Sequence, residues 1–305
     1  MELWQLKQLQ SLPLEVKVEK TKLRIKEWYE YWNGDVYVSF SGGKDSTVLL
    51  HIVREMYPDV PAVFVDTGLE YPEIREFVKQ FDNIITLKPK ISFREVIEKY
   101  GYPVISKEVS RDIAVARRKP DGRTADKFKR DSWYHKKYGD RFLLEKWNFL
   151  KDSDIPISNQ CCNIMKKNPI KEFDKIYNKK QFTGMMACES ALRKNEYLRS
   201  GCNAFENKVP KSSPLGFWQE QDILLYIKIH NIPFAKCYGE IIEENGKLKT
   251  TRCDRTGCMF CMFGVHLEKE PNRFQRMKET HPKIYDYCIN NLGIGKVLDY
   301  IGVKY

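Results

Sequence analysis

The sequence has no apolar run near the ~20 residues that a membrane-spanning helix needs. Its first residues, Met1-Glu2-Leu3-Trp4, open a polar segment of mixed charge that lacks the apolar core of a signal peptide. Internal repeats and low-complexity tracts are absent too, which excludes repeat architectures and linkers of biased composition. We therefore expect a folded, cytoplasmic protein that makes no contact with a membrane.

Two familiar site patterns are also missing. The histidines show neither the HxH nor the HExxH spacing, so we assign them no catalytic role. The phosphate loop of kinases and GTPases, with four residues between its first glycine and a Gly-Lys pair, does not occur. Nine cysteines without an export signal are not expected to form a disulfide framework, because cytosolic thiols are kept reduced. Metal binding or redox chemistry is the alternative.

The composition is that of a folded protein with a real core. The chain has 305 residues, of which 42% are hydrophobic, enough for one large α/β domain with smaller appended pieces. Its 52 lysines and arginines outnumber its 41 aspartates and glutamates, which gives a formal net charge of +11. This surplus favours phosphate-bearing partners such as nucleotides or nucleic acid, although it also serves solubility.

Short apolar segments alternate with amphipathic ones along the first half of the chain. The pattern predicts strands at 35–40, 61–65 and 83–87 and helices at 45–56, 72–80 and 91–100. The alternation resumes with a strand at 181–187 and a helix at 219–230. This spacing predicts an α/β fold with a doubly wound, mostly parallel sheet, whose ligands bind at the carboxyl ends of the strands.

Changes in pattern divide the chain into three segments. Residues 1–33 form an N-terminal helical segment that ends at the turn pair Asn33-Gly34. Residues 34–232 hold the nucleotide-binding α/β domain, with a polar and basic insertion at about 119–141. Residues 233–305 form a cysteine-rich, mostly helical C-terminal region, with a helix expected at 272–290.

A glycine-rich loop follows the first predicted strand, in the stretch Ser39-Phe40-Ser41-Gly42-Gly43-Lys44-Asp45-Ser46. The glycines let the backbone approach a ligand closely, and the N–H groups and the positive end of the next helix dipole attract anions. Lys44 neutralises further phosphate charge. A tight turn alone needs the glycines but not the serines, the lysine and the aspartate around them, so we interpret the loop as a phosphate site.

This loop resembles the SGGKDS loop of the PP-loop ATP pyrophosphatases, also called adenine nucleotide alpha hydrolases. Within that superfamily the chain is similar to the phosphoadenosine phosphosulfate (PAPS) reductase group along much of its length. The further matching pieces are Asp66-Thr67-Gly68-Leu69-Glu70-Tyr71-Pro72-Glu73, Gly101-Tyr102-Pro103 with Ser106-Lys107, Gly184 with Glu189-Ser190 and Arg193, and Ser213-Pro214-Leu215 with Trp218.

The resemblance implies a fold and a nucleotide. Members bind ATP, or an adenylylated sulfate, with pyrophosphate or sulfate on the loop and adenosine against the strand ends. Members that use ATP cleave it between the α and β phosphates and transfer AMP to a substrate oxygen. The nucleotide-binding residues implied here are Ser39, Ser41, Gly42, Gly43, Lys44, Asp45, Ser46, Asp66, Thr67, Gly68 and Arg193.

Three of these residues are implied to be catalytic. Lys44, together with Mg²⁺, would neutralise the pyrophosphate charge as the bond breaks. Asp45 would hold the metal ion or the loop, and Asp66 would lie near the ribose or the metal ion. The stretch Asp66-Thr67-Gly68 also suits a helix cap and a turn, a role that is compatible with ligand contact.

The cysteines form a second informative pattern, a Cys161-Cys162 pair and the stretch Cys258-Met259-Phe260-Cys261. A CxxC turn presents two thiolates to one metal centre, and four thiolates suit either a [4Fe–4S] cluster or tetrahedral zinc. Cys253 is an alternative ligand, because it adds a C-x4-C-x2-C spacing that occurs among [2Fe–2S] ligands. Cys188 follows a predicted strand end and is an outside candidate for sulfur handling.

A Cys-Cys pair followed by a distant CxxC is similar to the iron–sulfur pattern of the adenylylsulfate (APS) reductases and of related nucleic-acid-thiolating PP-loop proteins. The resemblance therefore favours a [4Fe–4S] cluster on Cys161, Cys162, Cys258 and Cys261, with zinc as the alternative. The reductases attack with a cysteine in a C-terminal Glu-Cys-Gly-Leu-His motif, whereas the last cysteine here is Cys288. Gly43-Lys44-Asp45 is also the loop form associated with ATP.

We therefore expect an ATP pyrophosphatase that adenylylates an acceptor, with nucleic acid favoured, for iron–sulfur-dependent sulfur transfer. An APS or PAPS reductase that uses an unusual cysteine is the alternative. A nucleotide- or nucleic-acid-binding accessory protein with little turnover is the second alternative. The expected partners are ATP or an adenylylated nucleotide, tRNA or DNA, and a sulfur-donor protein.

The basic insertion interleaves cations with aromatic residues. Its candidate nucleic-acid contacts are Lys127, Lys129, Arg130, Trp133, Lys136 and Lys137. In this interpretation the cations neutralise phosphates and Trp133 stacks on an exposed base. The alternative is a solvated basic surface whose aromatic residues pack inward.

Overall fold

The computed structural model describes residues 1–305 and divides the chain into two compact units. The first unit comprises Met1–Asp66, Glu70–Lys88 and Ile170–Thr256. The second comprises Thr67–Leu69, Pro89–Pro169 and Gly257–Tyr305. No helix combines the length and the apolar character of a membrane crossing.

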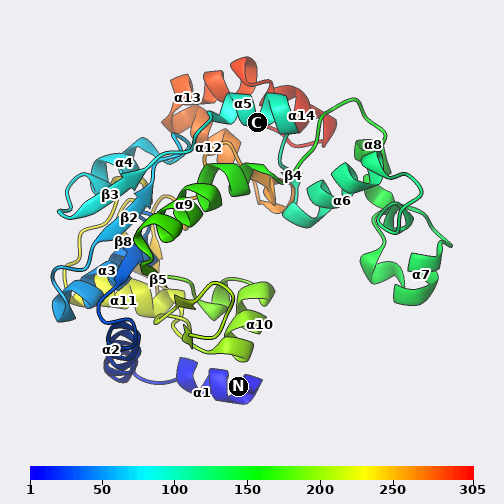
Figure 1. Ribbon diagram of the computed structural model, residues 1–305. Helices are drawn as coiled ribbons and strands as arrows, with labels where there is room; N and C mark the ends of the chain where they lie inside the picture. The colour runs from blue at the N-terminus through cyan, green and yellow to red at the C-terminus, as the bar shows by residue number, and fades with distance from the viewer. The chain divides into compact units, whose positions relative to one another are not determined.

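A six-stranded sheet forms the centre of the first unit (Figure 1). Its strands are β1 (Val36–Ser39), β2 (Ala62–Val65), β3 (Ile84–Leu87), β5 (Lys180–Thr183), β6 (Asn203–Ala204) and β7 (Lys211–Ser212). They lie in the order β3-β2-β1-β5-β7-β6, and all neighbouring pairs are parallel except β6 with β7. The predicted α/β fold with a mostly parallel sheet is therefore confirmed.

Helices of the first unit cover both faces of this sheet. They are α1 (Leu3–Gln10), α2 (Leu14–Tyr31), α3 (Lys44–Met56), α4 (Pro72–Val78), α9 (Asn168–Tyr177, from Ile170 in this unit), α10 (Ala191–Ser200) and α11 (Glu220–Ile229). Short 3₁₀ turns η5 (Ala187–Glu189) and η6 (Lys236–Tyr238) and the hairpin of β8 (Ile241–Glu244) and β9 (Lys247–Thr250) complete the unit.

The side chains of β1 alternate between the two faces, as a strand requires. Val36 and Val38 belong to the large core that includes residues of α2, α3 and α11. Tyr37 points to the opposite face, where its ring packs edge-on against Phe173 of α9 with ring centres 5.2 Å apart. Tyr37 also donates a hydrogen bond to Asp174 over 2.7 Å. The doubly wound arrangement follows from this alternation.

The N-terminal helix α2 packs onto the sheet through its buried Ile25 and Trp28. Two polar contacts fix its position. The indole N–H of Trp218 donates to the hydroxyl of Thr21 over 2.9 Å, and buried Lys17 forms an ion pair of 2.7 Å with Asp222. The helix expected in the N-terminal segment is therefore an integral part of the first unit.

The strand order reverses between β1 and β5, and ligands of such sheets bind at this kind of reversal. The glycine-rich loop leaves β1 there, and Gly184 leaves β5. A Cβ atom at Gly184 would lie 3.1 Å from both the carbonyl carbon of Asp45 and the backbone nitrogen of Ser46. The two loops therefore pack backbone against backbone.

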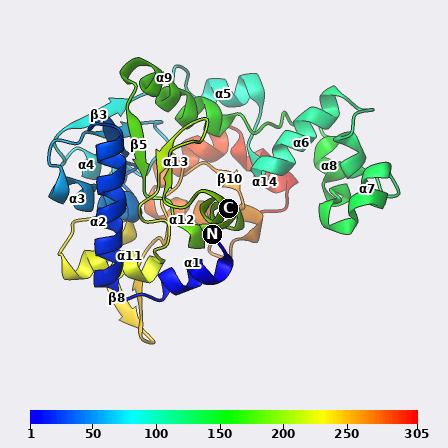
Figure 2. The same ribbon diagram turned by 60° about the horizontal axis from the view of Figure 1, so that its bottom comes forward.

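The second unit is mostly helical. Its helices and turns are α5 (Phe93–Tyr100), α6 (Lys107–Arg118), η1 (Ala125–Phe128), α7 (Trp133–Tyr138), η2 (Asp140–Phe142), η3 (Glu145–Trp147), α8 (Asn148–Lys151), the π-turn η4 (Asn163–Lys167), η7 (Val265–Leu267), α12 (Arg273–Thr280), α13 (Pro282–Asp286), the π-turn η8 (Tyr287–Asn291) and α14 (Ile294–Tyr300). Strands β4 (Val104–Ile105) and β10 (Met262–Phe263) pair in parallel. In Figure 1 and again in Figure 2, α6, α7 and α8 lie together.

The helix expected at 272–290 is divided in the structure. Its first part, α12, ends at Thr280, and α13 begins at Pro282. Proline supplies no N–H for the helical ladder and its ring crowds the preceding turn, so the helix stops before it. Proline has a related effect near the cysteine pair, where the five-residue π-turn η4 precedes Pro169, which has no N–H to donate to the carbonyl of Met165.

Arg117 of α6 holds the segment that leads to the cysteine pair. Its guanidinium donates hydrogen bonds to the backbone carbonyl oxygens of Leu150, Lys151, Ser153 and Ile155. Burial lowers the pKa of Arg117. A buried carbonyl oxygen that loses its hydrogen-bond donor destabilises the folded protein. Next along the chain, Tyr102 and Pro156 are joined by a backbone hydrogen bond of 2.7 Å.

Replacing Arg117 with lysine should therefore destabilise the second unit. A lysine ammonium cannot reach four separate carbonyl oxygens, and two or more left without a donor cost about 3 kcal/mol. Urea unfolding of Arg117→Lys should show this loss, whereas the neighbouring exposed Arg118→Lys should stay within about 0.5 kcal/mol of the original chain. Equal effects of the two substitutions would contradict the role given to Arg117.

Candidate functional site

The glycine-rich loop is held by its own serine hydroxyls. The backbone N–H of Ser41 donates to the hydroxyl of Ser46 over 3.2 Å, and that hydroxyl in turn donates to the carbonyl of Gly43 over 3.0 Å. The loop between β1 and α3 is therefore a closed, internally bonded turn. This arrangement explains why serines accompany the glycines in the sequence.

Gly42 is required by its surroundings and by its backbone. Its φ of +69° is a conformation that residues with side chains rarely adopt. A Cβ atom there would lie 2.8 Å from a methyl group of Ile74 and 2.9 Å from a methyl group of Val78. The loop therefore passes directly over α4. Gly43 then forms the N-cap of α3 without a side-chain cap, an arrangement suited to binding an anion.

Lys44 lies at the first position of α3 and is only 4% exposed. Its ammonium forms an ion pair of 3.1 Å with Glu220, the first residue of α11. The same ammonium lies 5.1 Å from the ring centre of Tyr238, and the Tyr238 hydroxyl lies 3.4 Å from the Lys44 backbone nitrogen as a hydrogen-bond acceptor. The charge of Lys44 is thus fixed at the entrance to the loop by an acidic and an aromatic neighbour.

Asp45 is the buried acid of the loop. Burial raises the pKa of its carboxyl, and the positive charges of Lys44, Arg255 and Arg193 partly offset this effect. The negative charge of Glu220 acts in the same direction as burial. An ionised Asp45 is consequently an energetic cost of the folded state, of the kind found at functional sites.

Glu189 lies between two arginines beside the loop. Arg193 of α10 donates a short hydrogen bond to one carboxylate oxygen of Glu189, and Arg255 lies 3.9 Å from the other. Burial lowers the pKa of Arg193, and the neighbouring charge of Arg255 adds to this effect. The two arginines around this one carboxylate repel each other, and they would gain from a second anion.

The remaining residues implied for nucleotide binding lie at or after strand ends. Ser39 is the last residue of β1 and is paired in register with Val63 and Thr183. Asp66 follows β2 and accepts a hydrogen bond of 3.0 Å from Arg75 of α4. Thr67 and Gly68 belong to the second unit. In that unit, the Thr67 hydroxyl accepts a hydrogen bond of 3.2 Å from the Leu69 N–H.

Several residues of this charge cluster are not predicted from the sequence. They are Glu220, Tyr238, Arg255 and Thr256, whose hydroxyl lies 2.7 Å from the Tyr238 hydroxyl. Each is far from the loop in sequence, and none belongs to a local motif. One sequence feature does point to Glu220: the family match at Ser213-Pro214-Leu215 and Trp218 lies just before the start of α11, where Glu220 is the first residue.

Cys188 is the exposed cysteine of the first unit and belongs to the same neighbourhood. Burial of its sulfur raises the pKa of Cys188, the positive charge of Arg255 lowers it, and the negative charge of Asp45 raises it. Its thiol donates weakly to the carbonyl of Trp218 over 3.5 Å. A thiol with a raised pKa is a poor nucleophile at neutral pH, because the thiolate is the reactive form.

The second unit brings together the four cysteines predicted to be ligands, Cys161, Cys162, Cys258 and Cys261. Burial raises the pKa of Cys161, and the charges of the other three thiols raise it further. No group of three or more His, Cys, Asp or Glu side chains is arranged to hold a metal ion. The four thiols are close enough for their charges to act on one another.

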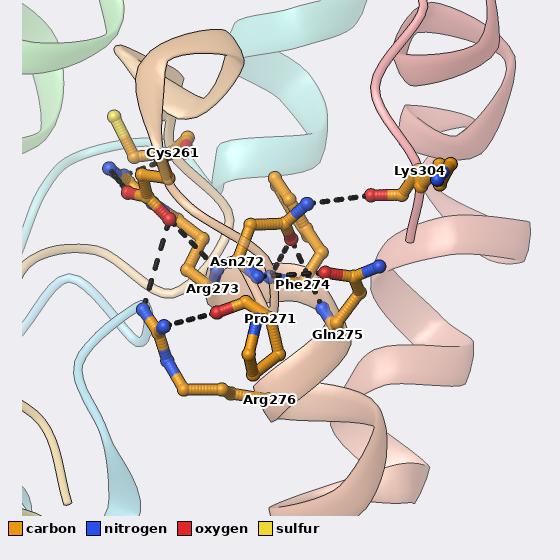
Figure 3. Close-up of polar contacts among 9 residues, drawn as sticks. Cys261, Pro271, Asn272, Arg273, Phe274, Gln275, Arg276 and Lys304 are labelled. Carbon is orange, nitrogen blue, oxygen red and sulfur yellow. Dashed lines mark hydrogen bonds and ion pairs between the residues drawn. The ribbon is translucent and has the colours of Figure 1, made fainter.

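The CxxC turn is supported by Arg273, the first residue of α12 (Figure 3). Arg273 donates to the carbonyl of Cys261 over 2.9 Å and to the carboxylate of Glu268 over 2.7 Å. Asn272 caps α12 by accepting from two backbone N–H groups, and it donates to the carbonyl of Lys304 over 2.8 Å. Within the turn, the N–H of Cys261 bonds to the carbonyl of Cys258 over 3.1 Å.

Cys253, the alternative ligand, has its contacts in the first unit. Its thiol donates to the carbonyl of Cys237 over 3.0 Å. A hydrogen bond between the two thiols lowers the pKa of Cys253 and raises that of Cys237. The positive charge of Lys44 also lowers the pKa of Cys253. Within the first unit the structure thus pairs Cys253 with Cys237.

The basic insertion divides its cations between two kinds of contact. Lys127 forms an ion pair of 2.6 Å with buried Asp112, and Arg130 forms one of 2.8 Å with Glu145. Lys137 instead lies over the ring of exposed Trp133, 5.0 Å from its centre. The remaining two predicted contacts, Lys129 and Lys136, are exposed.

Comparison with known proteins identifies the family of the chain. The model of the phosphoadenosine phosphosulfate reductase domain matches residues 35–134 and 103–262. An uncharacterized protein of Methanocaldococcus jannaschii is 26% identical over 90% of this chain and 53% of its own length. A second from the same organism is 25% identical over 88% of this chain and 43% of its own length. The chain thus spans about half the length of these relatives.

Shorter relatives and a solved structure carry reductase names. The adenosine 5'-phosphosulfate reductase of Bacillus cytotoxicus is 23% identical over 70% of this chain and 73% of its own length. The structure of a phosphoadenylyl-sulfate reductase from Candida auris, in a phosphate complex, aligns with a TM-score of 0.42 and 15% identity. That alignment covers 81% of this chain and 98% of the other. Because the domain model matches most of the chain, the protein belongs to the phosphoadenosine phosphosulfate reductase domain family.

Proposed function

We propose that the protein is an ATP pyrophosphatase of this family that adenylylates an oxygen of an acceptor, with nucleic acid as the favoured acceptor, for replacement of that oxygen by sulfur. The observation that carries the proposal is the buried Lys44 at the glycine-rich loop, within a cluster of charges at the reversal of the sheet. A loop of this kind suits the two adjacent charged groups of a pyrophosphate.

The residues of the site have separate tasks in this reaction. The acceptor oxygen attacks the α phosphorus of ATP, and the bond to the bridging oxygen breaks as pyrophosphate leaves. The loop N–H groups and Lys44 stabilise the charge that develops on the leaving pyrophosphate. Asp45 is suited to hold Mg²⁺, which supplies further charge neutralisation when bound. Arg193 and Arg255 offer positive charge to the phosphate that stays with the adenosine.

The second half of the reaction replaces the activated oxygen. Hydrosulfide attacks the carbon that carries the adenylylated oxygen, the carbon–oxygen bond breaks, and AMP leaves with the bonding electrons. Carbon–sulfur bond formation of this kind is redox-neutral, so atoms and electrons balance without an oxidant. A sulfur-donor protein is the proposed source of the sulfide.

The four neighbouring cysteines support an iron–sulfur cluster in this function. Tetrahedral zinc, the alternative, would also take four thiolates. Four cysteines whose charges act on one another can supply the ligands of a [4Fe–4S] cluster. When bound, the cluster would supply iron that holds the incoming sulfide.

A sulfonucleotide reductase is the second candidate, and Cys188 is the observation in its favour. This exposed thiol acts electrostatically on the same site as Asp45 and Arg255. The raised pKa of Cys188 disfavours the thiolate that must attack sulfur. Cys288 is no alternative nucleophile, because it is fully buried in the turn that follows α13.

The central test is product formation from ATP by anaerobically purified protein, without acceptor, with bulk tRNA and with DNA. We expect AMP and pyrophosphate, stimulated by one of the two polynucleotides. Lys44→Ala should lower the rate at least about 100-fold, because it removes a preorganised charge at the leaving group. Lys22→Ala, which breaks a comparable 2.9 Å ion pair with Glu55, should leave the rate unchanged.

Two results would overturn the proposal. ADP as the product would mean that the bond between the β and γ phosphates breaks, whereas the proposed reaction breaks the bond between the α and β phosphates. Sulfite formed from APS or PAPS with a thiol donor, together with no AMP from ATP under any acceptor, would favour the reductase and Cys188.

Asp45→Asn should raise stability while it lowers AMP formation. The folded protein bears the cost of an ionised, buried Asp45 at neutral pH, and the amide removes that cost, a gain on the order of 1 kcal/mol. Because the pKa in the folded state is raised, the gain should be full at neutral pH and vanish as pH falls toward the ordinary value of 3.8. Urea unfolding across this pH range measures it.

The exposed Asp59→Asn is the matched control, and it should change neither stability nor its pH dependence. A constant gain of Asp45→Asn at all pH values would mean that desolvation of the carboxylate is not the cause. A loss of stability at neutral pH would show that the carboxylate is a net stabiliser of the loop.

Arg273→Ala should weaken iron binding, because Arg273 holds the carbonyl of Cys261 and groups behind a metal ligand typically contribute about tenfold or more in affinity. Arg276→Ala is the control, since Arg276 also faces Glu268, at 3.8 Å, but bonds to the carbonyl of Pro271. Iron content and brown colour after anaerobic purification are the readouts. Equal iron in both variants would contradict the role of Arg273.

A further inference from the structure

Exposed aromatic rings and cations alternate on the surface of the second unit around α7 and η2. Trp133 is 49% exposed, Tyr138 is 44% exposed and Phe142 is 42% exposed. Burial of large aromatic side chains normally stabilises a protein, so three exposed rings within one short segment indicate a surface that binds a partner. We call these three rings, with the cations beside them, the aromatic–basic surface.

Each of these rings has a cation over it. Arg123 lies 5.6 Å from the centre of the Trp133 ring, and Lys137 lies 5.0 Å from the same ring and 5.5 Å from Tyr138. Arg141 lies 5.5 Å from the Phe142 ring. Cation–π contacts at exposed sites are weak, so a partner with aromatic rings and negative charges can replace them.

The surrounding segment carries an excess of positive charge. Residues 119–149 contain nine lysines and arginines against five aspartates and glutamates. Two of the cations, Lys127 and Arg130, pair with the acids Asp112 and Glu145 and hold the fold of the segment. The cations over the aromatic rings have no ion pair of this kind, which separates structural charges from charges that face solvent.

We infer that the aromatic–basic surface binds single-stranded nucleic acid, with bases stacked on its rings and phosphates on Arg123, Lys137 and Arg141. Base–aromatic stacking beside a basic track is the usual basis for binding single strands without sequence preference. The inference deepens the proposed function by naming the acceptor class and its binding surface, and it rests on that function for its biological role.

The geometry of the rings favours a single strand over a duplex. The Trp133 and Tyr138 rings are 6.2 Å apart and inclined at 85°, and those of Tyr138 and Phe142 are 6.2 Å apart and inclined at 79°. Bases of one strand in a duplex are parallel and follow one another at about 3.4 Å. Rings at large angles to one another therefore suit bases that are unstacked and turned separately, as in loops and single strands.

Fluorescence anisotropy with labelled oligothymidylate and oligouridylate, in the absence of ATP, tests this inference. Trp133→Ala with Tyr138→Ala should weaken binding at least about fivefold, the effect of losing one modest stacking contact. Lys137→Gln with Arg141→Gln should reduce the slope of the logarithm of affinity against that of salt concentration by about 1.4, or about 0.7 for each phosphate contact.

The matched control is an exposed cation–aromatic pair elsewhere in the same unit. Lys99 lies 5.5 Å from the ring centre of Tyr100, which is 38% exposed, at the end of α5. Lys99→Gln with Tyr100→Ala should leave affinity and salt dependence unchanged. Thermal unfolding of every variant should match the original chain, because the substituted side chains are exposed.

Three binding results would overturn the inference. These are no binding of either single strand by the original chain, equal affinity of the Trp133/Tyr138 variant and the control, and equal affinity for oligothymidylate and its duplex with oligodeoxyadenylate. Failure of the proposed function would give a different result from failure of this inference. Single strands would still bind through the aromatic–basic surface, but tRNA and DNA would stimulate no AMP formation. Stimulated AMP formation that is unchanged in the Trp133/Tyr138 variant would reject the surface and keep the function.

Discussion

The candidate site depends on the contact between two loops at the reversal of strand order in the first unit. Parallel pairing of β1 with β5 brings the glycine-rich loop against Gly184, where a Cβ atom would make a tight contact of 3.1 Å with the backbone of Asp45. The chain after β5 then supplies Glu189 and Arg193, and α11 supplies Glu220. A side chain at position 184 would therefore require a small shift of one loop against the other, next to the charges that surround Asp45.

The sequence predicts the parts of this site that are contiguous. Glycines, serines and a lysine between an apolar strand and an amphipathic helix define the loop and α3 within a few residues, because these elements are set by local backbone and hydrogen-bonding requirements. Glu220 and Tyr238 lie 176 and 194 residues from Lys44 in the chain. Their contacts with Lys44 depend on how α11 and η6 pack against the loop, and no periodicity or spacing in the sequence predicts that packing.

The second unit shows the same division between local and tertiary information. The resemblance to the iron–sulfur pattern of the APS reductases implies that four cysteines lie together, and the charges of Cys162, Cys258 and Cys261 do act on Cys161. By contrast, the sequence of the basic insertion does not predict that Lys127 forms an ion pair with a buried aspartate while Lys137 lies over a tryptophan ring. Acidic partners such as Asp112 lie outside the basic run, so pairing is decided by packing. The helix expected at 272–290 fails at His281-Pro282 for a purely local reason that the sequence does contain.

Because Lys44 forms an ion pair with Glu220, an anion that binds to Lys44 at the loop must replace the Glu220 carboxylate. The ammonium already has a carboxylate at 3.1 Å, so an incoming anion gains only the difference between its own attraction and that of the carboxylate it displaces. A singly charged anion of similar size gains little from this replacement, whereas a polyphosphate with several charges gains much more. Displaced Glu220 is half exposed, at 48%, and can be hydrated, while its return competes with the product for the lysine. One surface carboxylate can thus act both as a filter for highly charged ligands and as an aid to their departure.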